Sequence, residues 1–320
     1  MNEQSRRDFL NDVGRGMILT GLGASLAAEL GVGAMAREGD TDLLDFGKLR
    51  PLVGLMQNTN VNKLQPILVK KLKAGQTDLK SLIAAAALAN AETFGGQDYV
   101  GFHTEMALLP ALQMSKELPT ERQALPILKV LYRNTARIQE TGRKKTLHPI
   151  EAAKLSKEQN GPQKLRDAVR AGRIKEADAI FAATMSQKEL DQAYNDMMWY
   201  VQDDTDIHQF VLAHRAYVLI DVVGKDHAHT LLRQSVRQCA HHASQRNKRK
   251  NYDPSIRRDI PKLVDQYKLL GIKIGKRDPG DKWVAKMAQT IYENDRYKAA
   301  EAIAASLAEG ISPEVIGEAI

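Results

Sequence analysis

Apolar residues recur at helical spacing along almost the whole chain after residue 60. The pattern runs through 64–72, 125–131 and 174–181, where each segment would place its apolar side chains on one helix face. The apolar run 217–223 could form a buried strand, but it continues a helical stripe from the preceding residues, so a helix is favoured. The pattern therefore predicts an all-α fold, arranged as a bundle or a short solenoid of repeated helical units.

The expected helix ends follow from glycine and proline. Glycines after the periodic segments predict helix C-termini at Gly75, Gly95, Gly224 and Gly310. Ser312 stands before a proline, which is typical of a helix N-terminus. The Ala-rich run that ends before Gly95 has small side chains, which would allow neighbouring helices to approach closely.

Similar segments return in the same order along the chain, which indicates internal repeats. The segment 173–182 resembles 296–305, and the basic segment 143–149 resembles 248–254. These matches predict a linker at 37–61, a first helical unit at 62–140, a basic connector at 141–172, a second unit at 173–246, a basic connector with helices at 247–294, and the start of a third unit at 295–320. Because a helix after Ser312 would be too short to hold itself together, the chain is expected to be a truncated form of a three-unit protein.

Composition narrows the class of protein. The chain has 320 residues, 43% of them hydrophobic and 27% charged, which is ordinary for a folded soluble protein and excludes collagen-like and low-complexity chains. Its single cysteine, Cys239, cannot form an intramolecular disulfide. One thiol also excludes a zinc finger and covalent c-type haem.

The first residues have the layout of a targeting segment. Ser5-Arg6-Arg7-Asp8-Phe9-Leu10 resembles the twin-arginine (Tat) export motif, and a moderately apolar stretch leads to Ala34-Met35-Ala36, a signal-peptidase site. The resemblance covers residues 1–36 alone, and no family is recognised for the rest of the chain. It implies passage through the Tat translocase, cleavage after Ala36 and a periplasmic or other extracytoplasmic location. What is known of this route also raises the expectation of a bound metal or organic cofactor.

The chain is basic, with a formal net charge of +7. An exported protein meets no genome, so a nucleic-acid partner is not expected. An anionic envelope component is the more plausible partner for a positive face, although scattered solvated lysines would give the same composition. After signal cleavage no transmembrane span is expected.

Histidine and aspartate are concentrated in one segment. Six of the eight histidines lie within 208–242, together with several aspartates. These side chains are suited to zinc or non-haem iron, so iron or zinc is the expected cofactor if a metal is bound. The chain has neither HExxH nor ExxH, which argues against a zincin and a ferritin-like di-iron site.

The repeat singles out particular residues. His103 and His229 occupy matching positions, so in a pseudo-symmetric bundle both could reach one metal site, within about 10 Å of each other. His214, Asp98 and Asp226 would lie near that site as cofactor-binding residues. The alternative is that both aspartates are helix N-caps and both histidines are packing residues that each make one hydrogen bond.

Two functions remain open at this point. The first is an exported metalloprotein, an oxidoreductase or a hydrolase, with a His/Asp site between helical repeats. The second is a helical-repeat scaffold that binds a partner or an anionic envelope polymer through a basic face without catalysis. The chain lacks GxSxG, SxxK and a phosphate-binding glycine loop, so serine hydrolases, penicillin-binding proteins and nucleotide-binding enzymes have no support.

Overall fold

The computed structural model describes residues 43–142, 146–155, 161–204, 206–249 and 255–320. Within these ranges every regular element is an α-helix or a short 3₁₀-helix, apart from one isolated β-bridge, which confirms the all-α prediction. None of the described helices combines the length and apolar character needed to cross a membrane. The predicted signal segment, 1–36, lies outside the described residues.

The helices form two compact units. The larger unit contains the described residues up to Val201 and residues 206–248, and the smaller contains 202–204 and the described residues from Arg249 on. The helices of the larger unit are α3 (Arg50–Asn58), α4 (Val61–Lys73), α5 (Leu79–Phe94), α6 (Tyr99–Lys116), α7 (Ala124–Thr141), α8 (Gly161–Arg170), α9 (Ile174–Gln187), α10 (Leu190–Val201), α11 (Ile207–Val223) and α12 (Ala228–Arg246). Those of the smaller unit are α13 (Ser255–Gln266), α14 (Asp281–Glu293), α15 (Arg296–Ala308) and α16 (Pro313–Glu318).

These units differ from the predicted division. The two predicted helical units, 62–140 and 173–246, lie in one body and share one continuous hydrophobic core. The predicted linker, 37–61, contains α3, whose Val53 and Met56 are fully buried in that core. Both residues lie on one face at i,i+3 spacing, so even a short helix can bury them.

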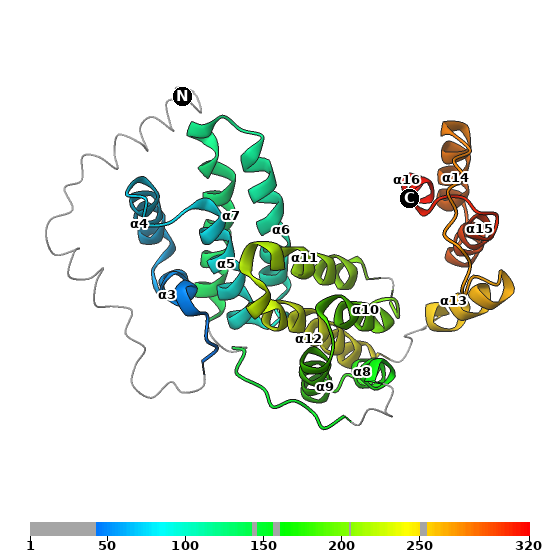
Figure 1. Cartoon of the computed structure of the whole chain (residues 1–320), viewed down its shortest axis with the longest axis horizontal. Coiled ribbons are helices and arrows are strands. Elements are labelled where there is room, and N and C mark those ends of the chain that lie inside the picture. The colour runs from blue at the N-terminus through cyan, green and yellow to red at the C-terminus, as the bar shows by residue number, and fades with distance from the viewer. Residues whose placement is uncertain (1–42, 143–145, 156–160, 205, 250–254) are drawn as a thin grey trace, which may run out of the picture. The chain divides into compact units, whose positions relative to one another are not determined.

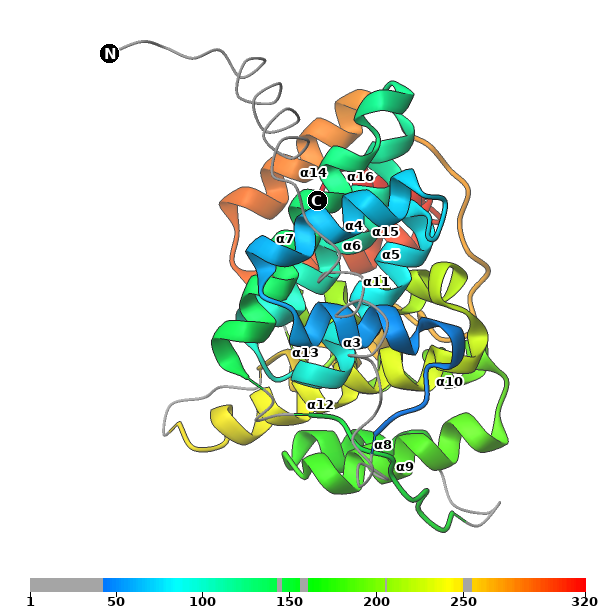
Figure 2. The ribbon, with the colours of Figure 1, turned by 90° about the vertical axis from the view of Figure 1, so that its left-hand side faces the viewer.

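The Ala-rich run forms the central helix of the larger unit, α5 (Figure 1). Every residue from Leu82 to Phe94 is buried, and α5 contacts α3, α6, α7, α11 and α12. A helix that is apolar on all sides is stable only when other helices surround it. As the sequence predicts, the small side chains of α5 leave room for several neighbours. Figures 1 and 2 also show α8 and α9 packed together next to α12.

Buried polar side chains tie the helices to one another. Glu92 on α5 accepts hydrogen bonds from Arg50 and Gln57 on α3, both at 2.8 Å. Asp178 on α9 accepts from Arg233 and Arg237 on α12. Each carboxylate is fully buried, and each has a cationic partner that offsets the cost of removing its charge from water.

The predicted helix ends agree with the structure. Gly95 adopts the left-handed conformation at the C-terminus of α5, Gly224 follows α11, and the Ser312 side chain caps α16. The run 217–223 is the last part of α11, so the helix favoured by its pattern is the structure it adopts. Gly96 has a further role, since a Cβ at that position would lie 2.1 Å from the Gln234 carbonyl oxygen on α12.

The smaller unit has its own, smaller core of Ile311, Val315 and Ile316. Among its described residues an isolated bridge joins Arg277 to Ile311 in parallel orientation, with Ser312 N–H donating to the Arg277 carbonyl at 2.9 Å. Here too a glycine permits close contact, because a Cβ on Gly275 would lie 2.2 Å from the Gly310 carbonyl oxygen.

Candidate functional site

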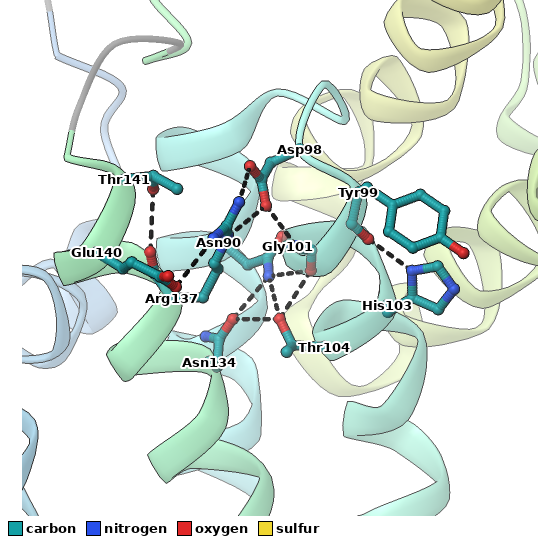
Figure 3. A network of polar contacts seen from close by, with 10 residues as sticks. All are labelled: Asn90, Asp98, Tyr99, Gly101, His103, Thr104, Asn134, Arg137, Glu140 and Thr141. Atoms are coloured by element: carbon teal, nitrogen blue, oxygen red, sulfur yellow. Dashed lines mark hydrogen bonds and ion pairs between the residues drawn. The ribbon is translucent and has the colours of Figure 1, made fainter.

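The start of α6 is held in place by charge. Asp98 is the N-cap of α6 and accepts a hydrogen bond from Gly101 N–H at 2.7 Å. The same carboxylate receives two hydrogen bonds of 2.8 Å from Arg137 on α7, and Arg137 also donates to Glu140 at 2.9 Å (Figure 3). Asp98 is thus an N-cap, one of the two roles that its position in the sequence allowed, and it also connects α6 to α7.

A buried amide network fixes the packing of three helices. Asn90 Nδ2 on α5 donates to the Gly101 carbonyl oxygen at 2.8 Å and to Asn134 Oδ1 on α7 at 2.7 Å. Thr104 on α6 lies within hydrogen-bond distance of both asparagines (Figure 3). These hydrogen bonds hold the first turns of α6 against α5 and α7, although Asn90 Oδ1 is buried without a hydrogen-bond partner among the described residues.

His103 follows this network on α6. Its Nδ1 lies 2.6 Å from the Tyr99 carbonyl oxygen, and its ring packs against the rings of Tyr99 and Phe102, with centroids 4.4 and 4.9 Å away. Figure 3 shows the Tyr99 and His103 rings together at one side of the amide network. A carbonyl oxygen only accepts, so Nδ1 carries the hydrogen. In the neutral ring, Nε2 then has a lone pair that can accept a proton.

His103 also lines a cleft of about 320 Å³ between α6 and α7. The lining residues are Tyr99, Val100, His103, Thr104 and Ala107 from α6, with Val130 and Arg133 from α7. Thr104 belongs to the amide network, so this wall of the cleft is rigid. The cleft therefore presents an imidazole, a guanidinium and a largely apolar surface to any small molecule that enters it.

A cluster of imidazoles and one carboxylate adjoins His103. The His103 and His208 rings have centroids 4.8 Å apart. Asp206 is the N-cap of α11, and its Oδ1 lies 2.6 Å from His208 Nδ1. Its Oδ2 lies 3.1 Å from both His242 Nδ1 and Arg246 Nη2 on α12. One partly buried carboxylate therefore orients two imidazoles and a guanidinium, and one of these imidazoles contacts His103.

The cluster shifts the pKa values of its members. Burial favours the neutral carboxyl of Asp206, but the hydrogen bonds from His208 and the nearby imidazoles outweigh it, and the pKa of Asp206 is lowered. Burial lowers the pKa of His242, although Asp206 opposes the effect. At neutral pH the Asp206 carboxylate is therefore ionised and can hold the adjoining rings in one orientation.

The structure gives His103 and His229 different surroundings. His229 lies at the N-terminal end of α12 with its ring against Phe181, whereas the ring contacts of His103 include His208. No ring contact joins His103 to His229 among the described residues. His242, which belongs to the cluster beside His103, is 13 positions after His229 on α12. Along α12, His229 is therefore roughly 20 Å of helix rise away from His242 and the cluster beside His103.

His229 has the character of a packing residue. Burial lowers its pKa to about 4, with a further contribution from Arg233, so the ring is neutral. Its Nε2 is buried and has no hydrogen-bond partner among the described residues. Matching sequence positions converge only when the segments that carry them pack as equivalent units. The two segments instead lie in unlike environments of a single core.

The other predicted site residues do not join the cluster. His214 is exposed on α11, and Asp226 is exposed in the short 3₁₀-helix before α12. The N-cap of α12 is His227, without a side-chain cap bond, so the N-cap alternative is wrong for Asp226. Within the described ranges no group of three or more His, Cys, Asp or Glu side chains could hold a metal ion. The described residues thus give no support to an iron or zinc centre.

Sequence reasoning missed most of the residues that surround His103. One local signal was present, because Asp206 two positions before His208 at a helix start is the spacing of an N-cap. Tyr99 and His103 also share a helix face at i,i+4. Nothing in the sequence indicated that Arg133, thirty positions later, lines the same cleft as His103.

Comparisons of the chain with protein-family models, with curated proteins and with solved structures found no match. The all-α fold and the geometry around His103 are therefore the basis for assigning a function.

Proposed function

We propose that the larger unit is an enzyme that binds a small molecule in the α6–α7 cleft and uses His103 to transfer a proton. The observation that carries this proposal is that His103 belongs both to the cleft and to the imidazole–carboxylate cluster. Its ring lines the cleft and lies 4.8 Å from the ring of His208, which Asp206 orients. An imidazole with a fixed Nδ1 hydrogen, positioned by neighbouring groups, is the side chain most often used in general acid–base catalysis.

Hydrolysis is the reaction class that this arrangement supports best. Water would add its oxygen to an acyl carbon while one of its protons moves to His103 Nε2. The same proton would then return to the leaving oxygen, which completes the cleavage with no redox partner. The rigid wall formed by Thr104 and the amide network would keep the imidazole and the bound molecule in a constant relative position.

The test is hydrolysis of 4-nitrophenyl acetate by the full-length protein, with His103→Gln as the variant. We expect kcat/KM to fall about 100-fold or more, because general acid–base catalysis contributes at least that factor. His214→Gln is the matched control: it removes an exposed histidine on α11 and should leave the rate unchanged. Circular dichroism of both variants checks that they fold.

The proposal is overturned if the protein is no faster than the same concentration of free imidazole, or if His103→Gln keeps the full rate. A second candidate would then gain weight: a scaffold that binds an anionic envelope polymer. One observation favours it, namely that Lys70, Lys71 and Lys73 crowd the last turn of α4 and form no ion pair with a carboxylate among the described residues.

We also propose that the protein is exported through the Tat translocase, on the basis of the paired arginines. Replacing Arg6 and Arg7 together with lysine should leave the protein in the cytoplasm with its signal segment uncleaved. Cell fractionation and the mass of the purified chain measure both effects. Export of the double variant at the normal level would contradict the proposal.

A further inference from the structure

The α6–α7 cleft has an uncompensated positive charge. Arg133 is the one permanently charged side chain among the described lining residues, none of which is acidic. Glu140 on α7 and Asp98 at the start of α6 both form ion pairs with Arg137. No ion pair connects Arg133 to a carboxylate in the described part of the chain. Its guanidinium is therefore available to a ligand.

The rest of the lining is suited to an apolar group. Val100, Ala107 and Val130 supply aliphatic surface, and Tyr99 and His103 supply two aromatic rings. At about 320 Å³ the cleft is at the small end of the range for sites that bind small molecules. A compact organic body, such as one aromatic ring or a short branched chain, fits this volume and this surface.

We infer that the ligand of the α6–α7 cleft is a small organic carboxylate with a compact apolar body, held by Arg133. The planar guanidinium presents two parallel N–H donors that match the two oxygens of a carboxylate. The aliphatic and aromatic lining favours an organic acid over inorganic phosphate, because phosphate has no apolar group to bury against that surface. This inference rests on the proposed function, because it names the substrate class of the same cleft.

In the proposed reaction the two cleft groups have separate tasks. Arg133 binds the carboxylate and sets the orientation of the substrate. His103 transfers the proton at the reacting bond, which must therefore lie away from the carboxylate in the same molecule. Arg133 is a binding residue in this scheme and the group that discriminates between charged and neutral substrates.

Binding of benzoate and benzamide to the full-length protein tests the inference. Both probes have one aromatic ring, and only benzoate has a negative charge. We expect benzoate to bind more tightly than benzamide in isothermal titration calorimetry. Arg133→Gln should weaken benzoate binding about 10-fold or more, the range for a hydrogen bond to a charged group, and leave benzamide binding unchanged. Arg122→Gln removes an exposed cation outside the cleft and should change neither affinity.

Three results would contradict the inference: equal binding of benzoate and benzamide, an Arg133→Gln variant that keeps benzoate affinity, or inorganic phosphate binding more tightly than benzoate. These outcomes are separable from failure of the proposed function. If His103→Gln abolishes ester hydrolysis while benzoate binding is independent of Arg133, the acid–base role stands and the carboxylate inference falls. If benzoate binds through Arg133 but hydrolysis is insensitive to His103, the cleft is a binding site without this catalysis.

Discussion

Replacing Glu105 with glutamine should make stability less dependent on pH. The free energy of unfolding of the variant, measured relative to the wild type, should be about 4 kcal/mol higher at pH 9 than at pH 5. Glu105 on α6 is fully buried, and Gln234 on α12 donates to its Oε1 at 2.6 Å. Its Oε2 is buried without a hydrogen-bond partner among the described residues. Burial raises the pKa of Glu105 to about 8, against a smaller lowering by the Gln234 hydrogen bond.

The sign of the effect follows from proton binding. Between the ordinary glutamate pKa of 4.5 and about 8 the folded protein retains a proton that the unfolded chain releases. Stability of the wild-type protein therefore falls as pH rises through this window and levels off above it. Glutamine has nearly the same shape, can accept the same hydrogen bond from Gln234 and does not ionise, so the variant should lose this part of the pH dependence.

Urea unfolding at pH 5, 7 and 9, followed by circular dichroism, measures the difference. Glu117→Gln is the matched control, because it removes an exposed carboxylate at the other end of α6. The control should follow the wild-type profile. Parallel profiles for the wild type and Glu105→Gln would show that Glu105 does not titrate in this range.

Replacing Asp178 with asparagine should destabilise the larger unit by about 3–5 kcal/mol. The Asp178 carboxylate is fully buried and accepts from Arg233 at 2.9 and 2.6 Å and from Arg237 at 2.8 Å. Both guanidinium groups are largely buried as well. Asparagine removes the single negative charge, so two buried cations would repel each other without compensation.

Thermal and urea unfolding of Asp178→Asn test this effect. Glu176→Gln is a stringent control on the same helix, since Glu176 pairs with Arg173 on the exposed surface and should contribute less than about 1 kcal/mol. A second variant, Asp178→Leu combined with Arg233→Met, replaces the main charged pair by apolar groups and should recover much of the lost stability. If Asp178→Asn is no more harmful than Glu176→Gln, the buried network is not a principal support of the fold.

Local features of the fold could be predicted from the sequence because their causes are local. Helical spacing of apolar residues reflects which side of each helix faces the core, whatever lies there. Gly95 ends α5 since the left-handed conformation costs glycine little, and Ser312 caps α16 through backbone N–H groups next to it. The close approach of neighbouring helices to α5 also follows from its small side chains.

The candidate site depended on contacts between distant parts of the chain. The sequence paired His103 with His229 through a repeat, whereas the tertiary structure places the His103 ring against His208 and in one cleft with Arg133. The predicted site residue Asp98 proved to hold α6 to α7, and Asp226 and His214 are exposed. A repeat indicates similar segments, but it does not determine which faces of those segments meet.

The sequence by itself determined that this protein is helical, where several of its helices end, and that the small side chains of the Ala-rich helix allow its neighbours to approach closely. Only the tertiary structure decided that α6, α7, α11 and α12 bring His103, Arg133, Asp206 and His242 to one region of the larger unit. The physical reason is that helical periodicity specifies which residues of a helix point inward, while the choice of partner depends on how all the helices pack together.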